Sequence, residues 1–376
     1  MEKSFFCDKQ KNRMFVVYRK KRSATRKGKN FLQWRGKYVM IKCSYQNYMT
    51  KYRKIRSRTE GLKRYGGAEK RIGKRDKKTE NPAAAKYRTG QSLEGKYMGF
   101  HIVADSCCEL TEDMKKRGNI EIAPLTLEVG GESILDDETF DQKLFLRKVA
   151  ECPECPKSAC PSPEYFRTAF LNGAKHCYAV TLSAQLSGSY NSAVLGANLA
   201  QEEDEDLKIH VFNSRSASIG ETLIVKKIVE CEEAGMSFER VVETVELYIS
   251  TQHTYFVLEN LETLRKNGRL SKTKALVASA LKIKPVMGAT SEGDIVQLDQ
   301  ARGINKALMK MVDAIVNDAQ HVENKTLAIS HCNCPERAEM VKEALLERLA
   351  VRDAFVLDTQ GVSSMYANDG GIIVVL

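Results

Sequence analysis

The side chains with the clearest capacity to bind a charged group lie in a Ser/Gly-rich turn at residues 181–193. This segment reads Thr-Leu-Ser-Ala-Gln-Leu-Ser-Gly-Ser-Tyr-Asn-Ser-Ala and follows a predicted buried strand at 178–182. A long helix is expected to begin in the turn and to continue through Ala200. Hydroxyls and backbone N–H groups then meet at the positive end of a helix, which suits a carboxylate or a phosphate. Many such turns only cap a helix, so the turn alone leaves both interpretations open.

A second candidate segment, residues 156–163, reads Pro-Lys-Ser-Ala-Cys-Pro-Ser-Pro. Its prolines and small hydroxyl residues predict a stiff loop that offers Ser158 to the same cleft. Ser162, Pro163 and Glu164 have the order of a helix start, with a Ser cap, a Pro at the first position and an early carboxylate. A plain capping loop is an equally good interpretation. Neither segment has the G-x-S-x-G pattern of a hydrolase or the phosphate-binding pattern of a P-loop.

These segments lie in an alternation of predicted strands and helices. Residues 98–376 form the body of the chain. In its first part we expect strands at 98–105, 120–129, 178–182 and 209–212. Helices are expected at 140–149, from Ser162, from the Ser/Gly turn and at 220–233. Further strands are expected at 255–258, 284–288, 294–298, 327–330 and 354–357, the second and third forming a hairpin. This pattern predicts an α/β fold with two domains.

The first domain, 98–253, is expected to have a mainly parallel sheet covered on both faces, and the second, 254–376, a mixed sheet. Ligands of such domain pairs usually bind between the domains, at the carboxyl ends of strands. We therefore expect a ligand cleft there.

The charge of the chain is distributed unevenly. Its 376 residues carry a formal charge of +11, but residues 1–97 hold 30 Lys and Arg against 7 Asp and Glu, which leaves the body a net charge of −12. An acidic body is a poor candidate for nucleic-acid binding, which depends on basic side chains. With 43% hydrophobic and 28% charged residues, the composition excludes a collagen-like or wholly disordered chain.

The sequence carries no signal for secretion or membrane insertion. No uninterrupted apolar run approaches the roughly 18–20 residues that span a bilayer, and the N-terminus lacks a secretory apolar region. The 11 cysteines are odd in number and irregularly spaced. Pairs such as Cys107 and Cys108, or Cys332 and Cys334, are poorly spaced for native disulfides. We therefore expect reduced thiols and a cytoplasmic protein.

Residues 1–97 form a basic extension with no heptad, zinc-ligand spacing or helical stripe. One interpretation is a tail for nucleic acid or anionic lipid, helped by tyrosines and Trp34. The other is a mis-annotated extension, because the globular pattern begins abruptly at Met98 and residues 93–96 can be encoded by codons that resemble a ribosome-binding site. We favour Met98 as the start. If the extension is translated, its composition predicts a disordered, mobile tail.

Several motifs occur in a characteristic order. A strand ending in Asp105-Ser106, the Ser158 loop and the Ser/Gly turn come first. They are followed by Asn-Ser-Arg-Ser-Ala-Ser-Ile-Gly at 213–220, Leu-Glu-Thr-Leu-Arg-Lys-Asn-Gly-Arg-Leu-Ser at 261–271 and Leu-Lys-Ile-Lys-Pro at 281–285. With this series the chain resembles the DegV family of bacterial fatty-acid-binding proteins, whose kinase-partnered members are called FakB. The resemblance covers 98–376 and implies two α/β domains with a fatty acid between them.

The resemblance also implies a set of ligand contacts. Ser158 stands where the family usually has a Thr that holds the ligand carboxylate, and Ser187, with Gly188, is the second carboxylate contact. Arg269 matches the arginine of the family's Gly-Arg-Ile/Leu motif, and Arg302 matches a second basic position near the head group. Both arginines are expected to meet the phosphorylated head group or the kinase.

The chain departs from the family near its C-terminus. Where the family commonly has His-x-Gly-Pro-Gly, residues 366–370 read Tyr-Ala-Asn-Asp-Gly. The Tyr366 hydroxyl is expected to replace part of the head-group contact that the His makes. Ala159 and Cys160 replace the more typical Ser and Gln. Carboxylate binding is expected to survive these changes, which bear mainly on phosphorylation.

Two other chemistries can be drawn from the sequence. In the first, Ser187 is the nucleophile of a lipid or ester hydrolase, with His331 as the best candidate base, although no motif places a histidine beside Ser187. In the second, the C-x₂-C-x₄-C spacing of the cysteines holds zinc, but its fourth ligand is unassigned and structural thiols are favoured. These cysteines are Cys152, Cys155 and Cys160, with Cys177 as a further candidate.

We therefore predict a cytoplasmic carrier that binds a long-chain fatty acid and has no catalytic residue, metal or other cofactor of its own. It is expected to present the carboxylate of the lipid to a dihydroxyacetone-kinase-like fatty acid kinase for acyl-phosphate formation. The alternative is the serine-dependent hydrolase that uses Ser187.

Overall fold

A computed structural model describes residues 2–8, 13–26, 29–37, 43–44, 99–270 and 283–376. The chain divides into two compact units, Met1–Ser92 and Leu93–Leu376. Met98, the favoured start, lies outside the described residues, as do Ser271 and residues 281–282 of the family motifs.

The first unit contains four strands of one antiparallel sheet. β2 (Arg13–Arg26) pairs with β1 (Glu2–Asp8), β3 (Lys29–Lys37) and β4 (Cys43–Ser44). The sequence pattern predicted no regular structure here. The aromatic and β-branched residues of the run 14–18 favour extended backbone and are the signal for strands in this segment. The mobility of residues 1–97 and their mis-annotation stay predictions.

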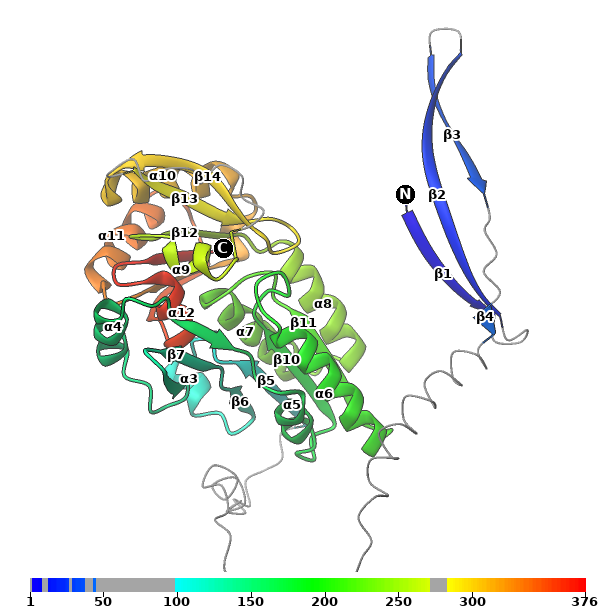
Figure 1. Cartoon of the computed structure of the whole chain (residues 1–376), viewed down its shortest axis with the longest axis horizontal. Coiled ribbons are helices and arrows are strands. Elements are labelled where there is room, and N and C mark those ends of the chain that lie inside the picture. The colour runs from blue at the N-terminus through cyan, green and yellow to red at the C-terminus, as the bar shows by residue number, and fades with distance from the viewer. Residues whose placement is uncertain (1, 9–12, 27–28, 38–42, 45–98, 271–282) are drawn as a thin grey trace, which may run out of the picture. The chain divides into compact units, whose positions relative to one another are not determined.

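The second unit has two lobes, and the first is built on a parallel sheet (Figure 1). Its strand order is β11-β10-β5-β6, and each neighbouring pair is parallel. The strands are β5 (Phe100–Asp105), β6 (Ile120–Ala123), β10 (His176–Thr181) and β11 (Lys208–Asn213). The parallel sheet predicted from the sequence is therefore confirmed.

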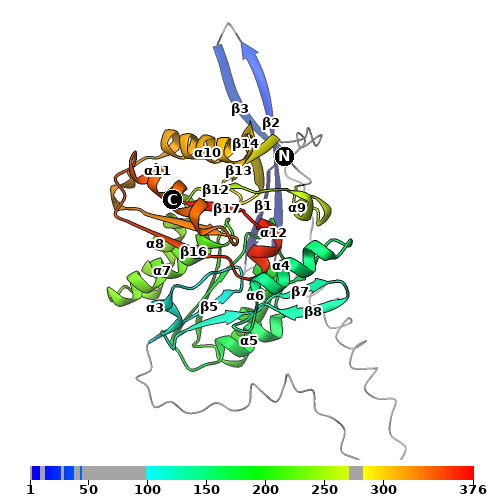
Figure 2. The ribbon, with the colours of Figure 1, turned by 90° about the vertical axis from the view of Figure 1, so that its left-hand side faces the viewer.

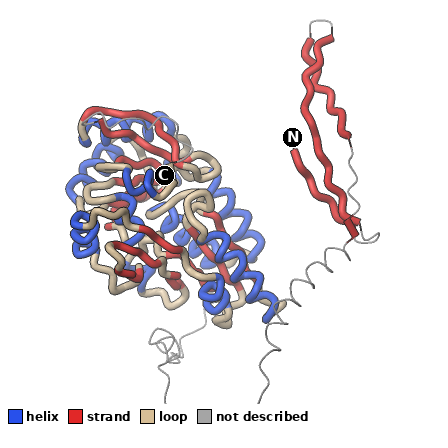
Figure 3. Tube along the Cα trace, in the orientation of Figure 1, coloured by secondary structure: helices blue, strands red, loops and turns tan. Residues whose placement is uncertain are grey.

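Helices cover both faces of this sheet, as predicted (Figure 3). One face packs on α7 (Ile219–Glu233) and α8 (Phe238–Ser250) through buried aliphatic residues such as Ile224 and Val245. The other face packs on α5 (Pro163–Phe170) and α6 (Ser189–Glu203). The Ser162 hydroxyl caps α5 by accepting the Tyr165 N–H, so the predicted helix start is confirmed. A short helix, α3 (Glu112–Lys115), follows β5.

A small antiparallel sheet of order β8-β7-β9 corrects two expectations for the first lobe. The single strand expected at 120–129 is two strands, β6 and β7 (Thr126–Val129), separated at Pro124, which has no N–H to donate to a ladder. The loop expected around Ser158 contains the strand β9 (Lys157–Ala159), which pairs with β7. The third strand is β8 (Glu132–Leu135), and α4 (Gln142–Glu151) follows it.

The second lobe has a six-stranded mixed sheet of order β14-β13-β12-β17-β15-β16, in which only β15 and β16 pair in parallel. Its strands are β12 (Thr254–Val257), β13 (Ile283–Ala289), β14 (Ile295–Arg302), β15 (Thr326–His331), β16 (Asp353–Asp358) and β17 (Ile372–Val375). The expected hairpin is the β13–β14 pair. The sequence pattern did not predict β17, the last of these strands.

The helices of this lobe are α9 (Glu262–Lys266), α10 (Ile304–Asp318), α11 (Pro335–Leu346) and α12 (Gly361–Ala367), with a 3₁₀ turn at Val322–Asn324. α10 and α11 pack on one face of the sheet. The opposite face meets α7 of the first lobe, where Ile219 and Leu223 contact Ala328 and Val375 (Figure 2). No helix in the described part of the chain is both long and apolar enough to span a bilayer. The expected boundary between 253 and 254 stays a prediction.

Gly196 allows the close approach of α5 and α6. A Cβ atom added at Gly196 comes within 2.6 Å of both the Phe166 Cβ and the Pro163 carbonyl oxygen. We predict that Gly196→Ala lowers the free energy of unfolding by about 1–3 kcal/mol, the usual cost of overpacking. Urea denaturation measures this change. Gly118→Ala is the matched control, because no atom lies within 4 Å of its added Cβ. Equal changes in the free energy of unfolding for the two substitutions contradict the role of Gly196 in the contact between α5 and α6.

Candidate functional site

A cavity of about 830 Å³, including its open mouth, lies between the two lobes of the second unit. Most of its lining side chains are apolar. They come from the first lobe (Leu125, Leu182, Leu186) and from the second (Phe256, Leu258, Leu264, Ile295, Ile373).

The Ser/Gly turn forms one part of the cavity wall, where β10 passes into α6. A buried carboxylate fixes the start of this turn, because Asp105 Oδ2 accepts the Leu182 N–H at 3.0 Å. Ser187 lines the cavity, and its hydroxyl donates to Ser189 Oγ and accepts the Ser189 N–H. Gly188 is the N-cap of α6, and its N–H has no acceptor among the described residues. The turn therefore presents a hydroxyl and a backbone donor at a helix N-terminus.

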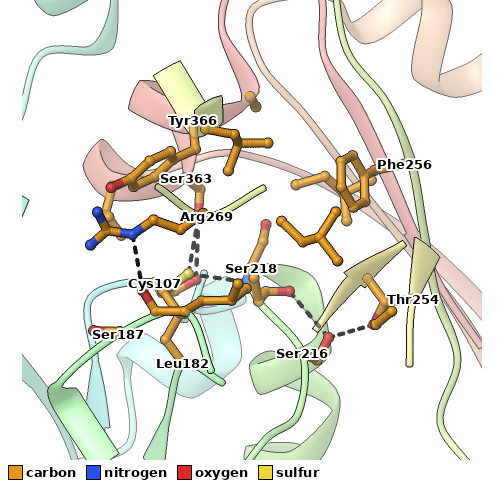
Figure 4. Close-up of a pocket in the computed structure, with 18 of the residues that line it drawn as sticks. Cys107, Leu182, Ser187, Ser216, Ser218, Thr254, Phe256, Arg269, Ser363 and Tyr366 are labelled. Carbon is orange, nitrogen blue, oxygen red and sulfur yellow. Dashed lines mark hydrogen bonds between the residues drawn. The ribbon is translucent and has the colours of Figure 1, made fainter. Parts of the chain in front are cut away.

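Ser158, Tyr366 and Arg269 form a second polar group on the cavity wall. Figure 4 shows Tyr366 and Arg269 side by side. Ser158 Oγ and the Tyr366 hydroxyl lie 3.3 Å apart. The Arg269 guanidinium carbon lies 5.7 Å from the centre of the Tyr366 ring. Its Nε donates to the Leu186 carbonyl in the Ser/Gly turn at 3.1 Å, and Nη1 donates to the Asn267 carbonyl. Arg269 thus links α9, α12 and the turn around one end of the cavity.

The other labelled polar pair lies away from this group, beside Phe256 (Figure 4). Ser216 Oγ and Thr254 Oγ1 are 2.6 Å apart, so each satisfies the other with a hydrogen bond. Cys107, Ser218 and Ser363 are labelled between the two polar regions, where they line the cavity together with apolar side chains (Figure 4). The cavity therefore has hydroxyl groups and the free Gly188 N–H at one end, and apolar side chains make up most of its lining.

The structure brings together four of the six residues predicted to contact the ligand or its kinase. Ser158, Ser187, Arg269 and Tyr366 all line the cavity, and Gly188 adjoins it without lining it. Arg302 does not join them. It ends β14, opposite Ile283, and its side chain is exposed and outside the cavity lining. A head-group contact by Arg302 therefore has no support in this geometry, and only the predicted kinase contact remains open for it.

The Tyr366 phenol is suited to act as a neutral hydrogen-bond donor. Burial raises its pKa, and the Ser158 hydroxyl and the Arg269 charge offset part of this rise. The phenol therefore keeps its proton at neutral pH and can donate it to an anionic head group. The replacement of the family's histidine contact by the Tyr366 hydroxyl stays a prediction.

Asp136, which the sequence analysis did not single out, positions the helix that carries Tyr366. Its two carboxylate oxygens accept the N–H groups of Gly361 and Val362 at 2.7 and 2.8 Å, and the Ser106 hydroxyl donates to it at 2.8 Å. A Cβ at Gly361 lies only 2.5 Å from Asp136 Oδ1, so the contact requires glycine. No sequence signal connects positions 136 and 361, because only the fold brings them together.

The geometry does not support the two alternative chemistries. Among the described residues, no histidine lines the cavity, and His331 Nδ1 instead accepts the Cys334 N–H and faces Asp358. Ser187 thus has no base beside it. The predicted zinc cysteines have separate neighbours: Cys155 Sγ lies beside Asn267, and Cys160 Sγ beside Ser192.

Sequence comparison finds one family that matches nearly the whole second unit. A family model described as "Uncharacterised protein, DegV family" matches residues 99–376. A DegV domain-containing protein of Streptococcus pneumoniae is 34% identical over 278 residues, which cover 73% of this chain and 98% of the relative.

Solved structures agree with this match. A DegV family protein from Ruminococcus gnavus, refined with vaccenic acid, is 54% identical with a TM-score of 0.73, and the match covers 74% of this chain and all of that one. The fatty acid kinase B3 protein of S. pneumoniae, loaded with linoleic acid, is 33% identical with a TM-score of 0.67, and the match covers 73% of this chain and 98% of that one.

The stability of the protein is predicted to depend on the protonation of Asp136. Burial raises the pKa of Asp136 to about 6, so between about pH 4 and 6 the folded protein keeps a proton that the unfolded chain has lost. The contribution of Asp136 to the free energy of unfolding therefore falls as pH rises through this window, by up to about 3 kcal/mol. Urea denaturation of the wild type and Asp136→Asn at several pH values measures the difference.

The stability advantage of the wild type over Asp136→Asn is expected to shrink from pH 4 to pH 6. Glu138→Gln, at an exposed neighbouring carboxylate, is the control. If the difference in the free energy of unfolding between wild type and Asp136→Asn stays constant or grows from pH 4 to pH 6, the raised pKa of Asp136 is contradicted.

Proposed function

Because this chain belongs to the DegV family, we propose that it binds a long-chain fatty acid in the cavity between its two lobes. The observation that carries the proposal is the combination of one polar end and a long apolar wall in a single cavity. The fatty acids in the Ruminococcus and Streptococcus structures support the same ligand class.

The apolar wall supplies most of the binding free energy. A sixteen-carbon fatty acid has about fourteen CH₂ groups, and burial of each is worth about 0.8 kcal/mol, or about 11 kcal/mol in total. The loss of translational and conformational freedom on binding offsets much of this gain. The polar end therefore needs only to orient the carboxylate.

Small hydroxyl groups are sufficient for that orientation. We propose that the carboxylate of the fatty acid accepts hydrogen bonds from the Ser158 and Ser187 hydroxyls and the Gly188 N–H. The Tyr366 hydroxyl is a further donor. Each hydrogen bond to a charged acceptor contributes roughly 1.5–3 kcal/mol when geometry is good. No buried ion pair is required, because the Arg269 guanidinium already donates to backbone carbonyls and lies beside the Tyr366 ring.

We further propose that the protein is a carrier that presents the carboxylate to a dihydroxyacetone-kinase-like fatty acid kinase, without catalysis of its own. The S. pneumoniae fatty acid kinase B3 protein supports a fatty acid kinase as the partner. Phosphorylation adds negative charge to the head group, and arginine side chains bind phosphate through paired N–H donors. Arg269 is then the head-group residue, and the exposed Arg302 a contact of the kinase.

The free thiols of the described residues support a reducing compartment. Nine described cysteines are unpaired, including the adjacent Cys107 and Cys108. We therefore propose that the carrier works in the cytoplasm, where thiols stay reduced.

The full-length protein, purified without added lipid, is predicted to retain a fatty acid. Mass spectrometry of the extracted lipid tests this directly. Ser187→Ala is expected to retain less lipid, because the carboxylate loses one hydroxyl donor, with a binding loss of about 1.5–3 kcal/mol or roughly 10- to 150-fold. Ser250→Ala, at an exposed serine of α8, is the control. A wild-type protein free of lipid contradicts the carrier function, and unchanged retention by Ser187→Ala removes that residue from the site.

Arg269→Ala is predicted to separate lipid binding from phosphorylation. The substitution leaves the apolar wall and the hydroxyl donors in place, so fatty-acid affinity is expected to change less than about 10-fold. Phosphoryl transfer by a fatty acid kinase is expected to fall by more than 10-fold, because the acyl phosphate loses its arginine partner. Arg265→Ala, at an exposed arginine of α9 paired with Glu262, is the control. A parallel loss of binding and phosphorylation in Arg269→Ala contradicts this division of roles.

A further inference from the structure

Three buried side chains, two of them from one turn and the third from a distant helix, converge beside the cavity. Asp105 ends β5, Cys107 lies in the turn that follows, and Glu221 lies in the first turn of α7. One carboxylate oxygen of each acid and the Cys107 sulfur all lie within 4.8 Å of one another. Asp105 and Glu221 are 0% exposed and Cys107 is 2% exposed.

Glu221 lacks the hydrogen bonds that a buried carboxylate normally has. Neither of its side-chain oxygens has a partner, and Oε1 of the nearby buried Glu109 has none either. Among the described residues, no lysine, arginine or histidine forms an ion pair with Asp105, Glu109 or Glu221. A buried ionised carboxylate without a counter-charge is strongly destabilising. The charge of the cluster is therefore offset either by bound protons or by a bound cation.

The other two members are held by backbone donors. Asp105 accepts the N–H groups of Cys107 at 3.1 Å and Leu182 at 3.0 Å. The Cys107 sulfur accepts the Ser218 N–H at 3.2 Å. In metal sites such second-layer hydrogen bonds orient the ligands and stabilise the anionic form of each. Asp105 and Cys107 are thus held in place, and Glu221 supplies free oxygens beside them.

We propose that Asp105, Cys107 and Glu221 bind one divalent transition-metal ion of the zinc class. A thiolate with two carboxylates is a donor set that Zn²⁺ accepts, whereas Mg²⁺ and Ca²⁺ prefer oxygen ligands alone. Three protein ligands leave a fourth tetrahedral position for water. This site differs from the cysteine cluster that was considered in the sequence analysis. It also departs from the expectation that the protein holds no metal.

The ion has a structural role in this proposal, next to the lipid cavity. Cys107 and Ser218 both line the cavity. The Ser218 hydroxyl donates to Glu109 at 2.9 Å and lies 2.8 Å from the Ser330 hydroxyl of β15 in the second lobe. Metal binding therefore joins the end of β5 to the start of α7 at the point where that helix meets the second lobe. The proposal does not depend on which ligand fills the cavity.

Metal titration of the full-length protein tests the site. The purified protein is stripped with a chelator, and Co²⁺ and then Zn²⁺ are added alone. Co²⁺ is expected to give a thiolate-to-metal charge-transfer band at one equivalent, and Zn²⁺ to displace it and to raise the melting temperature. Glu221→Gln and Cys107→Ser are each expected to weaken Zn²⁺ binding at least about 10-fold, as a lost metal interaction does, and Cys107→Ser to abolish the band.

Two controls distinguish this site from other thiols. Cys231→Ser changes another buried thiol on α7 that is outside the cluster and is expected to keep the band. Circular dichroism establishes that each variant is folded before titration. A folded wild type that binds no metal overturns the proposal and leaves a shared proton as the counter-charge of the cluster. A band that survives in Cys107→Ser but is lost in Cys155→Ser also overturns it, because the metal is then at the other cysteines.

Discussion

Removal of an acyl chain from water between two lobes is the interaction on which the proposed function depends. The cavity wall is assembled from residues of both lobes, so neither lobe alone encloses it. α7 makes this assembly possible. Its buried residues Ile219 and Leu223 contact the second sheet, whereas Ile224 and Ile228 pack on the first. The cavity therefore depends on a helix that belongs to both cores.

The polar end of the cavity depends on a small number of buried anchors. Asp105 holds the backbone where the Ser/Gly turn begins, and Asp136 holds the helix that carries Tyr366. These acids do not line the cavity themselves, but they fix the backbone from which the hydroxyl groups extend. Fixed hydroxyls and N–H groups suit the proposed carrier, because such groups can bind a carboxylate without a buried ion pair, whose desolvation is costly. The carboxylate can then remain accessible to a partner.

Local patterns in the sequence were sufficient to predict most of the fold. The alternation of apolar strands with long helices predicted the parallel sheet of the first lobe and the hairpin of the second, and the Ser162 cap was visible in three consecutive residues. The short strands β9 and β17 were missed. β9 has only three residues and takes its conformation from the pairing with β7, which no local pattern encodes.

The candidate site was predictable where a residue type and its neighbours form a motif. Ser158, Ser187 and Arg269 lie in such motifs, and the fold brings all three to one cavity. Arg302 lies in a motif too, but the direction of β14 leaves it exposed. The contacts of Asp136 and Glu221 were beyond prediction, because each depends on partners more than a hundred residues away in another element.

The orientation of the bound lipid tests the central claim most directly. A fatty acid with a photoreactive diazirine at its methyl end can be bound to the full-length protein, activated by light and located by mass spectrometry of peptides. The account predicts labelling of the apolar wall around Phe256, Ile295 and Ile373, away from the Ser187 turn, and competition by unlabelled fatty acid. Labelling confined to the turn around Ser187, or to the outer surface of the lobes, contradicts the account.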